Sequence, residues 1–312
     1  MTRPLAFVTG SSRGIGKAIA ADLAQAGFDL ALTARTVTEG ERREHSSTLQ
    51  ESDTSPLPGS LESTANLVTE AGADALVVSA DLLDPASLGA AIATTLERKG
   101  RIDVVVHNGR YIGPGHMDRF LDTPMELLEK QVQANVFAPL LINKLVLPSM
   151  IRAGGGIIVN ITSAAGYADP TKPAGNGGWG MGYGISKGAF QRIAGFLAVE
   201  LAEQNIRCFN IQPGAVSTER IAQDMAKFGI TAEGAPPEAI AKVVTWLCTS
   251  PDAGPFNGTT IEAQYFCHER DLLPSWAGPV WKDNRIRYDC SGAKLEDREL
   301  RLAERQGVTT TD

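Results

Sequence analysis

Short apolar runs alternate with amphipathic stretches along most of the chain. Most of the runs are almost continuously apolar, as are strands buried on both faces of a parallel sheet. Between them, apolar residues recur every three or four positions, as in Ile15, Ile19 and Leu23, and this spacing predicts helices. The alternation predicts an α/β fold with a doubly wound parallel sheet. The predicted strands are Leu5–Val8, Leu30–Thr33, Ala75–Ser79, Ile102–Val106, Ile157–Ile161, Ile206–Ile211 and Thr259–Ala263.

Two segments depart from this alternation. Residues 37–60 contain only Val37, Leu49 and Leu57 as aliphatic residues among Ser, Glu, Arg, Thr and Pro, which predicts a solvated, mobile insertion after the second strand. Residues 265–312 lack enough apolar residues for a core of their own. We therefore expect one domain over residues 1–264, followed by a C-terminal extension with a charged helix over residues 293–305.

Composition and charge narrow the class of protein. The chain of 312 residues is 43% hydrophobic and has a formal net charge of −7 without a basic cluster, which disfavours nucleic-acid binding. Its four cysteines are too few for a disulfide framework and lack metal-ligand spacing, which favours a reducing compartment.

Neither a signal peptide nor a membrane span is expected. The chain enters its first strand almost at once, which leaves no room for a signal peptide. The nearest approach to a span, Asn135–Ile151, is interrupted by Asn143 and Lys144 and is shorter than the ~18 residues required. We therefore predict a cytoplasmic protein that binds no membrane.

A glycine-rich turn joins the first strand to the first helix. Gly10, Gly14 and Gly16 stand in the segment Thr9–Gly16 with the spacing G-x-x-x-G-x-G. Glycines here allow a tight turn and let a pyrophosphate approach backbone N–H groups, and the start of the helix adds a favourable dipole. The strand before and the helix after the turn favour a dinucleotide site over an ordinary turn.

In this turn and in the motifs that follow, the sequence resembles the compact branch of the short-chain dehydrogenase/reductase family, over roughly residues 4–264. The resemblance implies a Rossmann-type domain in which Asp81 contacts adenine and the Pro213–Thr218 loop holds the nicotinamide. His107-Asn108-Gly109-Arg110 stands where the family usually has Asn-Asn-Ala-Gly, so only Asn108 is kept. The resemblance assigns to the cofactor Gly10, Ser12, Arg13, Gly14, Ile15, Gly16, Asp81, Leu82, Asn108, Gly109, Tyr183, Lys187, Pro213, Gly214, Val216 and Thr218.

Four residues stand at the catalytic positions of that family: Asn135, Ser163, Tyr183 and Lys187. Tyr183 and Lys187 are four positions apart at the start of a predicted helix, so both lie on one helical face. A nearby ammonium stabilises the phenolate form of a tyrosine, which suits the pair to give and take a proton near neutral pH. The spacing is common by chance, and its place after the Ser163 strand makes it specific.

Ser163 and Asn135 have supporting roles. Ser163 follows the Ile157–Ile161 strand, at the sheet edge where α/β folds bind ligands, and its hydroxyl can donate to a substrate carbonyl oxygen. Serine is also common in plain turns. Asn135 lies inside a long predicted helix that begins near Pro124, although asparagine is a weak helix former. The resemblance implies that Asn135 positions a water that relays protons to Lys187; bonding to the backbone is the structural alternative.

The end of the second strand indicates which nicotinamide cofactor is bound. An acidic residue here would bond the ribose 2′-OH and select NAD(H), but none occurs before Glu39. Arg35 stands there instead, and Arg13 lies in the glycine turn. Because guanidinium groups suit a 2′-phosphate, we predict NADP(H) over NAD(H). The alternative is that both arginines are solvated and the preference is loose.

The loops that would form the substrate pocket depart from the family. The stretch between Ser163 and Tyr183 is longer than usual and contains the glycine-rich segment Ala168–Gly180. This segment could be a lid with Trp179 as a wall of the crevice, or a simple excursion. Bulky residues also follow the last strand, where the family commonly has two glycines. The substrate stays open among acyl-thioester ketones, steroids, quinones, small ketones and sugars.

Two predicted helices, about 124–152 and 181–203, are apolar around most of their girth. The resemblance implies that such helices pair across a two-fold axis, so we expect a homodimer or homotetramer. The alternative cover for this surface is the 265–312 extension.

The residues and the resemblance together predict an NADP(H)-dependent oxidoreductase that interconverts a small-molecule ketone and a secondary alcohol. Tyr183 would be the general acid and base, and the hydride transfer needs no metal. A catalytically silent nucleotide-binding or scaffold protein of the same fold is the alternative, and the changed His107–Arg110 turn favours it. A nucleotide-sugar epimerase or dehydratase is disfavoured by the glycine spacing.

Overall fold

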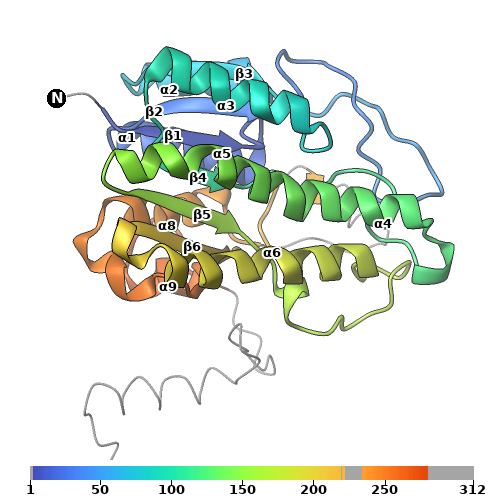
Figure 1. Ribbon diagram of the computed structural model, residues 1–312. Coiled ribbons are helices and arrows are strands. Elements are labelled where there is room, and N and C mark those ends of the chain that lie inside the picture. The colour runs from blue at the N-terminus through green and yellow to red at the C-terminus, as the bar shows by residue number, and fades with distance from the viewer. Residues whose placement is uncertain (1–2, 219, 222–233, 280–312) are drawn as a thin grey trace, which may run out of the picture.

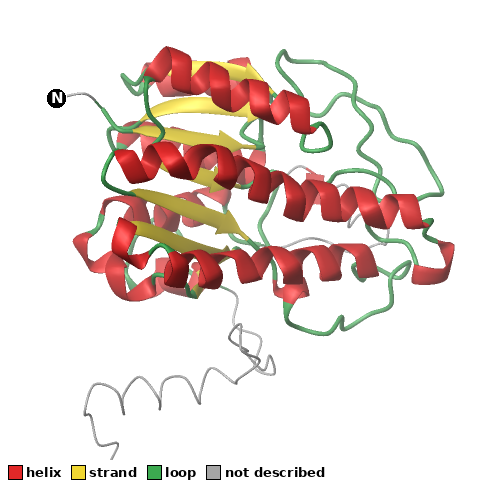
Figure 2. Ribbon diagram, in the orientation of Figure 1, coloured by secondary structure: helices red, strands yellow, loops and turns green. Residues whose placement is uncertain are grey.

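The computed structural model describes residues 3–218, 220–221 and 234–279. Within these residues, parallel strands form one seven-stranded sheet in the order β3-β2-β1-β4-β5-β6-β7, and helices cover both of its faces (Figure 1, Figure 2). The strands are β1 (Leu5–Thr9), β2 (Asp29–Ala34), β3 (Ala75–Ser79), β4 (Val104–His107), β5 (Gly156–Ile161), β6 (Ile206–Gln212) and β7 (Thr260–Glu262). The main helices are α1 (Gly14–Gln25), α2 (Leu61–Glu70), α3 (Pro85–Lys99), α4 (Met125–Val132), α5 (Ala138–Arg152), α6 (Met181–Glu200), α8 (Pro237–Thr249) and α9 (Ala263–Glu269).

Successive residues of a strand face opposite helical layers. In β1, Ala6 and Val8 belong to the core beneath α1, α2, α8 and α9, whereas Leu5 and Phe7 belong to the core beneath α3 and α5. All four side chains are buried. This two-sided burial explains why the strands are continuously apolar, and it confirms the predicted doubly wound sheet.

All seven predicted strands are present, each within two residues of its predicted ends. The strand order reverses between β1 and β4: β2 and β3 lie on one side of β1, and the chain then crosses to β4 on the other. In open α/β sheets the ligand crevice lies beyond the carboxyl ends of the strands at this reversal. The glycine turn follows β1 and the His107–Arg110 turn follows β4, so both stand at this point.

The 37–60 segment is packed more closely than its composition indicates. Figure 1 shows it as a long blue loop beyond the carboxyl ends of the strands. His45, Ser46, Ser47 and Ser60 are buried in it. Its polar groups bond one another, as where Glu44 Oε1 accepts from the backbone N–H of Ser46 at 2.8 Å. The prediction of a solvated insertion therefore holds for exposed stretches such as residues 38–40 and 49–52, and is wrong for residues 45–47, which are buried.

The first part of the predicted C-terminal extension belongs to the core. Phe266 and Cys267 of α9 are buried with the helices on their face of the sheet, and Leu273 and Trp276 pack against them. The core therefore continues past residue 264 to at least residue 276. The charged helix predicted over residues 293–305 lies outside the described residues.

Helices α4 and α5 are joined by a π-helical stretch, Gln133–Phe137, into one continuous rod. By length and composition Met125–Arg152 could cross a membrane, contrary to the expectation from sequence, because an 18-residue window within it has a mean hydropathy of 1.4. Half of that window is buried inside the domain. Ile142 and Val146, on its α5 part, are fully buried, so the apolar composition is that of a core helix.

Candidate active site

The glycine turn between β1 and α1 fits a pyrophosphate. Gly10 and Gly14 have φ values of +65° and +53°, which glycine adopts without strain. A Cβ on Gly16 would lie 2.3 Å from the carbonyl oxygen of Gly10, so only glycine lets α1 start this close to the turn. The first N–H groups of a helix have no acceptor within it, and the helix dipole favours an anion there.

The end of β4 is tied to this turn by hydrogen bonds. The side-chain amide of Asn108 donates to the carbonyl oxygens of Thr9 and Gly10, both at 3.0 Å. The Thr9 hydroxyl in turn accepts from the backbone N–H groups of Asn108 and Gly109, at 3.0 and 2.9 Å. Asn108, the one residue kept from the family's motif, therefore holds the glycine turn in shape.

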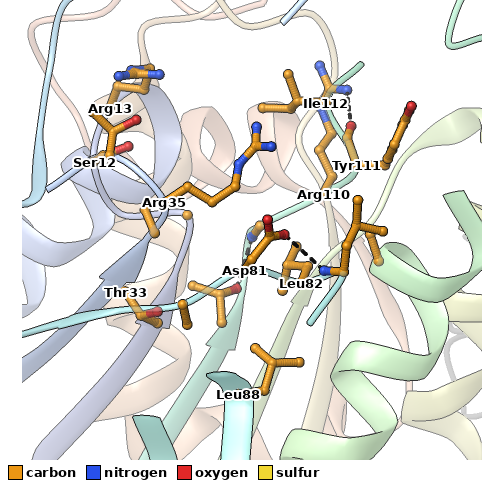
Figure 3. Close-up of a pocket in the computed structure, with 18 residues that line it drawn as sticks. Ser12, Arg13, Thr33, Arg35, Asp81, Leu82, Leu88, Arg110, Tyr111 and Ile112 are labelled. Carbon is orange, nitrogen blue, oxygen red and sulfur yellow. Dashed lines mark hydrogen bonds between the residues drawn. The ribbon is translucent and has the colours of Figure 1, made fainter. Parts of the chain in front are cut away.

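A cleft opens beyond the carboxyl ends of β1 to β4 (Figure 3). Arg35 extends over it from the end of β2. Asp81 Oδ1 accepts from the backbone N–H of Leu83 at 2.9 Å, which fixes the turn after β3. Leu82 packs against Gly109, where a Cβ would lie 3.1 Å from Leu82 Cδ1. The predicted cofactor residues that line this cleft are Gly10, Ser12, Arg13, Arg35, Asp81, Leu82 and Gly109.

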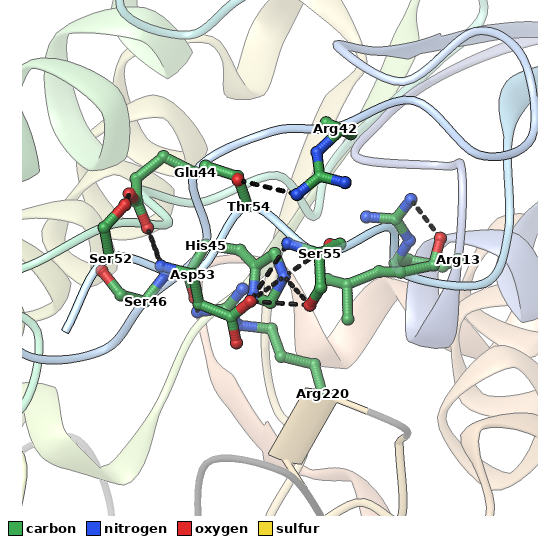
Figure 4. A network of polar contacts seen from close by, with 11 residues as sticks. Arg13, Arg42, Glu44, His45, Ser46, Ser52, Asp53, Thr54, Ser55 and Arg220 are labelled. Carbon is green, nitrogen blue, oxygen red and sulfur yellow. Dashed lines mark hydrogen bonds and ion pairs between the residues drawn. The ribbon is translucent and has the colours of Figure 1, made fainter.

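The Arg13 guanidinium is engaged by the 37–60 segment (Figure 4). Its Nε donates to the carbonyl oxygen of Pro58 at 3.0 Å, and its Nη2 donates to those of Gly59 at 2.7 Å and Leu57 at 3.3 Å. Two of its three nitrogens are therefore used to hold the segment beside the glycine turn. Of the two arginines predicted to bind a 2′-phosphate, Arg35 is therefore the one that extends over the cleft.

The 37–60 segment also contacts the loop that follows β4. The carbonyl oxygen of Ser47 accepts from the backbone N–H of Met117 at 2.9 Å. The Asp118 carboxylate accepts from the backbone N–H of Leu49, at 3.1 and 3.0 Å to its two oxygens. One segment thus connects the glycine turn with the loop that contains His116, beside Tyr183.

Tyr183 and Lys187 lie one helical turn apart on α6, and both are buried. Lys187 Nζ donates to the carbonyl oxygen of Ile161, at the end of β5, at 2.8 Å. Burial, and after it the positive charge of Arg110, lower the pKa of Lys187 to about 7. An amine that titrates near neutral pH beside a buried tyrosine is suited to proton transfer.

Ser163 stands at the start of a short 3₁₀ turn, Ala164–Gly166, directly after β5. Its hydroxyl accepts from the backbone N–H of Ala165 at 3.3 Å, and this contact leaves the hydroxyl proton available to a substrate oxygen. A Cβ on Gly166 would lie 2.9 Å from the backbone of Lys187. The glycine therefore allows the Ser163 turn to pack directly on α6.

Asn135 occupies the π-helical stretch between α4 and α5 and is buried. Its Oδ1 accepts from the backbone N–H of Tyr111 at 2.7 Å, and its Nδ2 donates to Ser186 Oγ at 2.9 Å. It therefore joins the loop after β4 to the residue next to Lys187. These contacts match the structural alternative considered from sequence, and π-helical stretches inside α-helices often mark functional sites.

Three further residues surround Tyr183, and all three lie in the stretches 109–122 and 164–182 from which the sequence predicts pocket walls. The His116 ring lies 4.5 Å from the Tyr183 ring, and the Trp179 ring lies 5.2 Å from both. The Arg110 guanidinium carbon lies 5.8 Å from the centre of the Tyr183 ring. Trp179 therefore packs beside Tyr183, and its role as a wall of the crevice stays a prediction. His116 and Arg110 come from the loop after β4, whose individual contacts the sequence does not predict.

The loop after β6 folds over the start of α1. Gly214 has a φ of +69°, and Val216 is buried. Gln264 Nε2 donates to the carbonyl oxygens of Pro213 and Ala215, at 2.9 and 2.7 Å. This bulky residue, which stands where the family has small ones, thus braces the loop. The predicted residues Pro213, Gly214, Val216 and Thr218 all lie on it, and a Cβ on Gly14 would lie 3.3 Å from Thr218.

This arrangement of glycine turn, cleft and buried Tyr–Lys pair defines a class of nucleotide-dependent oxidoreductases. A family model described as short chain dehydrogenase matches residues 54–227. The 2-(R)-hydroxypropyl-CoM dehydrogenase of Xanthobacter autotrophicus is 34% identical over 216 residues, which are 69% of this chain and 75% of that enzyme. The chain belongs to the short-chain dehydrogenase/reductase family, as its sequence indicates.

Solved structures agree with this assignment. Acetoin dehydrogenase YohF from Salmonella typhimurium superposes with a TM-score of 0.65 and 28% identity, over 84% of this chain and 94% of that one. A metagenomic short-chain oxidoreductase in complex with NADP has a TM-score of 0.63 and 26% identity, over 83% and 95%. The fold and the enzyme class, an NAD(P)-dependent oxidoreductase acting on CH–OH groups, follow from these relatives.

Proposed function

We propose that the protein interconverts a ketone and a secondary alcohol with NADP(H), using Tyr183 as the general acid and base. The observation that carries the proposal is the burial of Tyr183 and Lys187 on one face of α6, where Lys187 Nζ bonds the end of β5. Ser163 follows that strand by two residues. β5 is the neighbour of β4 in the sheet, so these groups lie close to the strand reversal, where α/β sheets bind dinucleotides.

The chain's own residues account for each proton and for the orientation of the substrate. The bound nicotinamide supplies or accepts the hydride. Ser163 and Tyr183 donate hydrogen bonds to the carbonyl oxygen, and Tyr183 transfers its proton as the alkoxide develops. Lys187, when protonated, stabilises the resulting phenolate. Asn135 holds the Tyr111 backbone and Ser186 in place, and we keep its role in a water relay as a proposal.

The preference for NADP(H) rests on Arg35. It extends over the cleft from the end of β2, the place at which a carboxylate would select NAD(H). Asp81, also in the cleft, lies at the end of β3 and is engaged with the backbone of Leu83. Both cofactors occur among related structures, since one contains NADP and a 7 alpha-hydroxysteroid dehydrogenase contains NADH. The choice therefore depends on the residues of this chain.

NADPH oxidation against a panel of carbonyl compounds tests the proposal, with Tyr183→Phe as the control. Turnover by the natural protein and its loss in the variant would support the function. A catalytically silent protein would bind NADPH in both forms and show no turnover in either.

A further inference from the structure

Arg110 departs from the family's motif and brings a positive charge to the proposed catalytic residue Tyr183. It is half-buried and follows β4, where the family usually has glycine. Its Nη1 donates to the carbonyl oxygen of Tyr111 at 3.0 Å and lies 3.3 Å from His116 Nε2. Its guanidinium carbon faces the Tyr183 ring at 5.8 Å. The side chain is therefore held in a fixed direction beside the Tyr183 ring.

The surroundings of Arg110 are positively charged. Among the described residues, no carboxylate forms an ion pair with it. Burial, and then Arg110, Arg220 and Lys187, lower the pKa of His116 well below its usual value, so this imidazole is neutral. Asp118, which lies in the same loop, accepts hydrogen bonds from the backbone N–H groups of Leu49 and Gly115. In a chain with a net charge of −7, this is a local excess of cations.

Neutral His116 explains how the guanidinium keeps its direction. Arg110 Nη1 is a donor, so His116 Nε2 accepts and the ring proton sits on Nδ1. The ring is buried and packs on both Tyr183 and Trp179. His116 is therefore a positioning residue for Arg110. The Nε and Nη2 of Arg110 have no hydrogen-bond acceptor among the described residues. The edge of the guanidinium that these two nitrogens form is therefore available to a ligand.

We propose that Arg110 binds a carboxylate of the substrate, so that the enzyme acts on small oxo acids and the corresponding hydroxy acids. This inference rests on the proposed function, because it names the substrate class of that same site. A guanidinium fork matches a carboxylate in a bidentate geometry. The closeness of Arg110 to the Tyr183 ring places the carboxylate within a few bonds of the carbonyl group.

The cofactor's phosphates are the competing ligands for Arg110. The pyrophosphate has the start of α1, with Gly14 and Gly16, and the 2′-phosphate has Arg35 at the end of β2. Arg110 lines the same cleft as Arg35 and Asp81. Its guanidinium, however, contacts His116 and faces the Tyr183 ring, which the substrate carbonyl must reach. The arrangement therefore favours a substrate anion.

The test compares oxo acids with their uncharged amides. Pyruvate and acetoacetate are assayed with NADPH beside pyruvamide and acetoacetamide, in the natural protein, in Arg110→Met and in Arg119→Met. Arg119 is an exposed arginine nearby, so its variant loses the same charge without touching the site. We expect kcat/KM for the better acid to exceed that of its amide by about 10²-fold, since hydrogen bonds to a charged group are strong.

Arg110→Met should reduce this preference to within about threefold, mostly through KM, while Arg119→Met keeps it. The acid and its amide are reduced by the same Lys187-assisted step, so a change in the pKa of Lys187 leaves the ratio of their kcat/KM values unaffected. NADPH affinity, measured by calorimetry, should not weaken in either variant, because removing the Arg110 charge can only raise the pKa of Lys187. Loss of NADPH binding in Arg110→Met would overturn the proposal in favour of a cofactor role, and so would equal use of acid and amide by the natural protein.

A binding measurement separates this inference from the proposed function. Oxamate, a carboxylate beside an amide carbonyl, is titrated into the protein saturated with NADP⁺. Binding by the natural protein and its loss in Arg110→Met would support the anion site even if no carbonyl compound were turned over. Turnover of neutral ketones without any oxamate binding would leave the enzyme function standing and refute the anion site.

Discussion

At the scale of single residues, the site combines two cations that the surroundings treat differently. The Arg110 guanidinium is half-buried and bonds Tyr111 and His116, whereas Lys187 is buried and its pKa is lowered to about 7. The charge on Lys187 is therefore present below that pH and is lost as the pH rises through it. A bound dinucleotide is anionic, so it binds more tightly to the protein when Lys187 is protonated.

We expect NADPH affinity to weaken between pH 7 and 9, by at most about tenfold per pH unit, since a single proton is linked. Lys187→Met should bind NADPH more weakly at pH 7, with little further change up to pH 9. Calorimetric titration at several pH values measures both. A natural protein whose affinity is constant over this range would show that Lys187 is not the linked group.

Arg35 should decide between the two cofactors. Arg35→Asp should reverse the preference from NADPH to NADH, because a carboxylate repels the 2′-phosphate and accepts a hydrogen bond from a free 2′-OH. The ratio of the two dissociation constants, measured by calorimetry, checks this. Equal binding of NADPH and NADH by the natural protein would contradict the role given to Arg35.

At the scale of elements, the features that could be predicted are those that depend on residues close together in the sequence. Strand periodicity placed all seven strands, and the glycine spacing placed the turn, because each depends on residues adjacent in sequence. The sequence predicts that residues 109–122 border the pocket, but it does not single out His116 and Arg110 as neighbours of Tyr183, since tertiary packing alone brings them to α6. The 37–60 segment was misjudged because composition does not reveal that its polar groups pair with one another and with Arg13.

The 37–60 segment should contribute to cofactor binding because it packs against the glycine turn. Gly59 has a φ of +99°, and a Cβ there would lie 2.6 Å from the Ser12 carbonyl oxygen. Gly59→Ala should displace the segment and weaken NADPH binding about tenfold, equivalent to ~1.4 kcal/mol. Gly40 has a φ of +84° with open space around it, so Gly40→Ala is the matched control and should change affinity by less than about twofold. Equal dissociation constants for the two variants would show that the contact between Gly59 and the glycine turn does not affect cofactor binding.

At the scale of the whole molecule, an apolar surface on α5 and α6 favours self-association. Phe196 is 60% exposed and Val199 is 80% exposed on α6, and Phe137 before α5 is 54% exposed. Exposed apolar side chains gathered on neighbouring elements mark interaction surfaces. We therefore expect a homodimer or homotetramer that uses this face.

Phe196→Glu combined with Val199→Glu should convert the oligomer to a monomer of 33.1 kDa, as measured by light scattering. Stability should hold, because both side chains face away from the core. Leu121→Glu is the control, since Leu121 is 92% exposed outside these two helices. A natural protein that is already monomeric at micromolar concentration would refute the assigned face.

The most direct test of the central claim is the turnover of Tyr183→Phe on the best substrate found. Removing the hydroxyl removes the proton donor and leaves the ring packed between His116 and Trp179. The account predicts that NADPH binds as before, while kcat falls by roughly 10² or more, as loss of a general acid does. A variant that keeps most of its activity would contradict the assignment of Tyr183 as the group that transfers the proton.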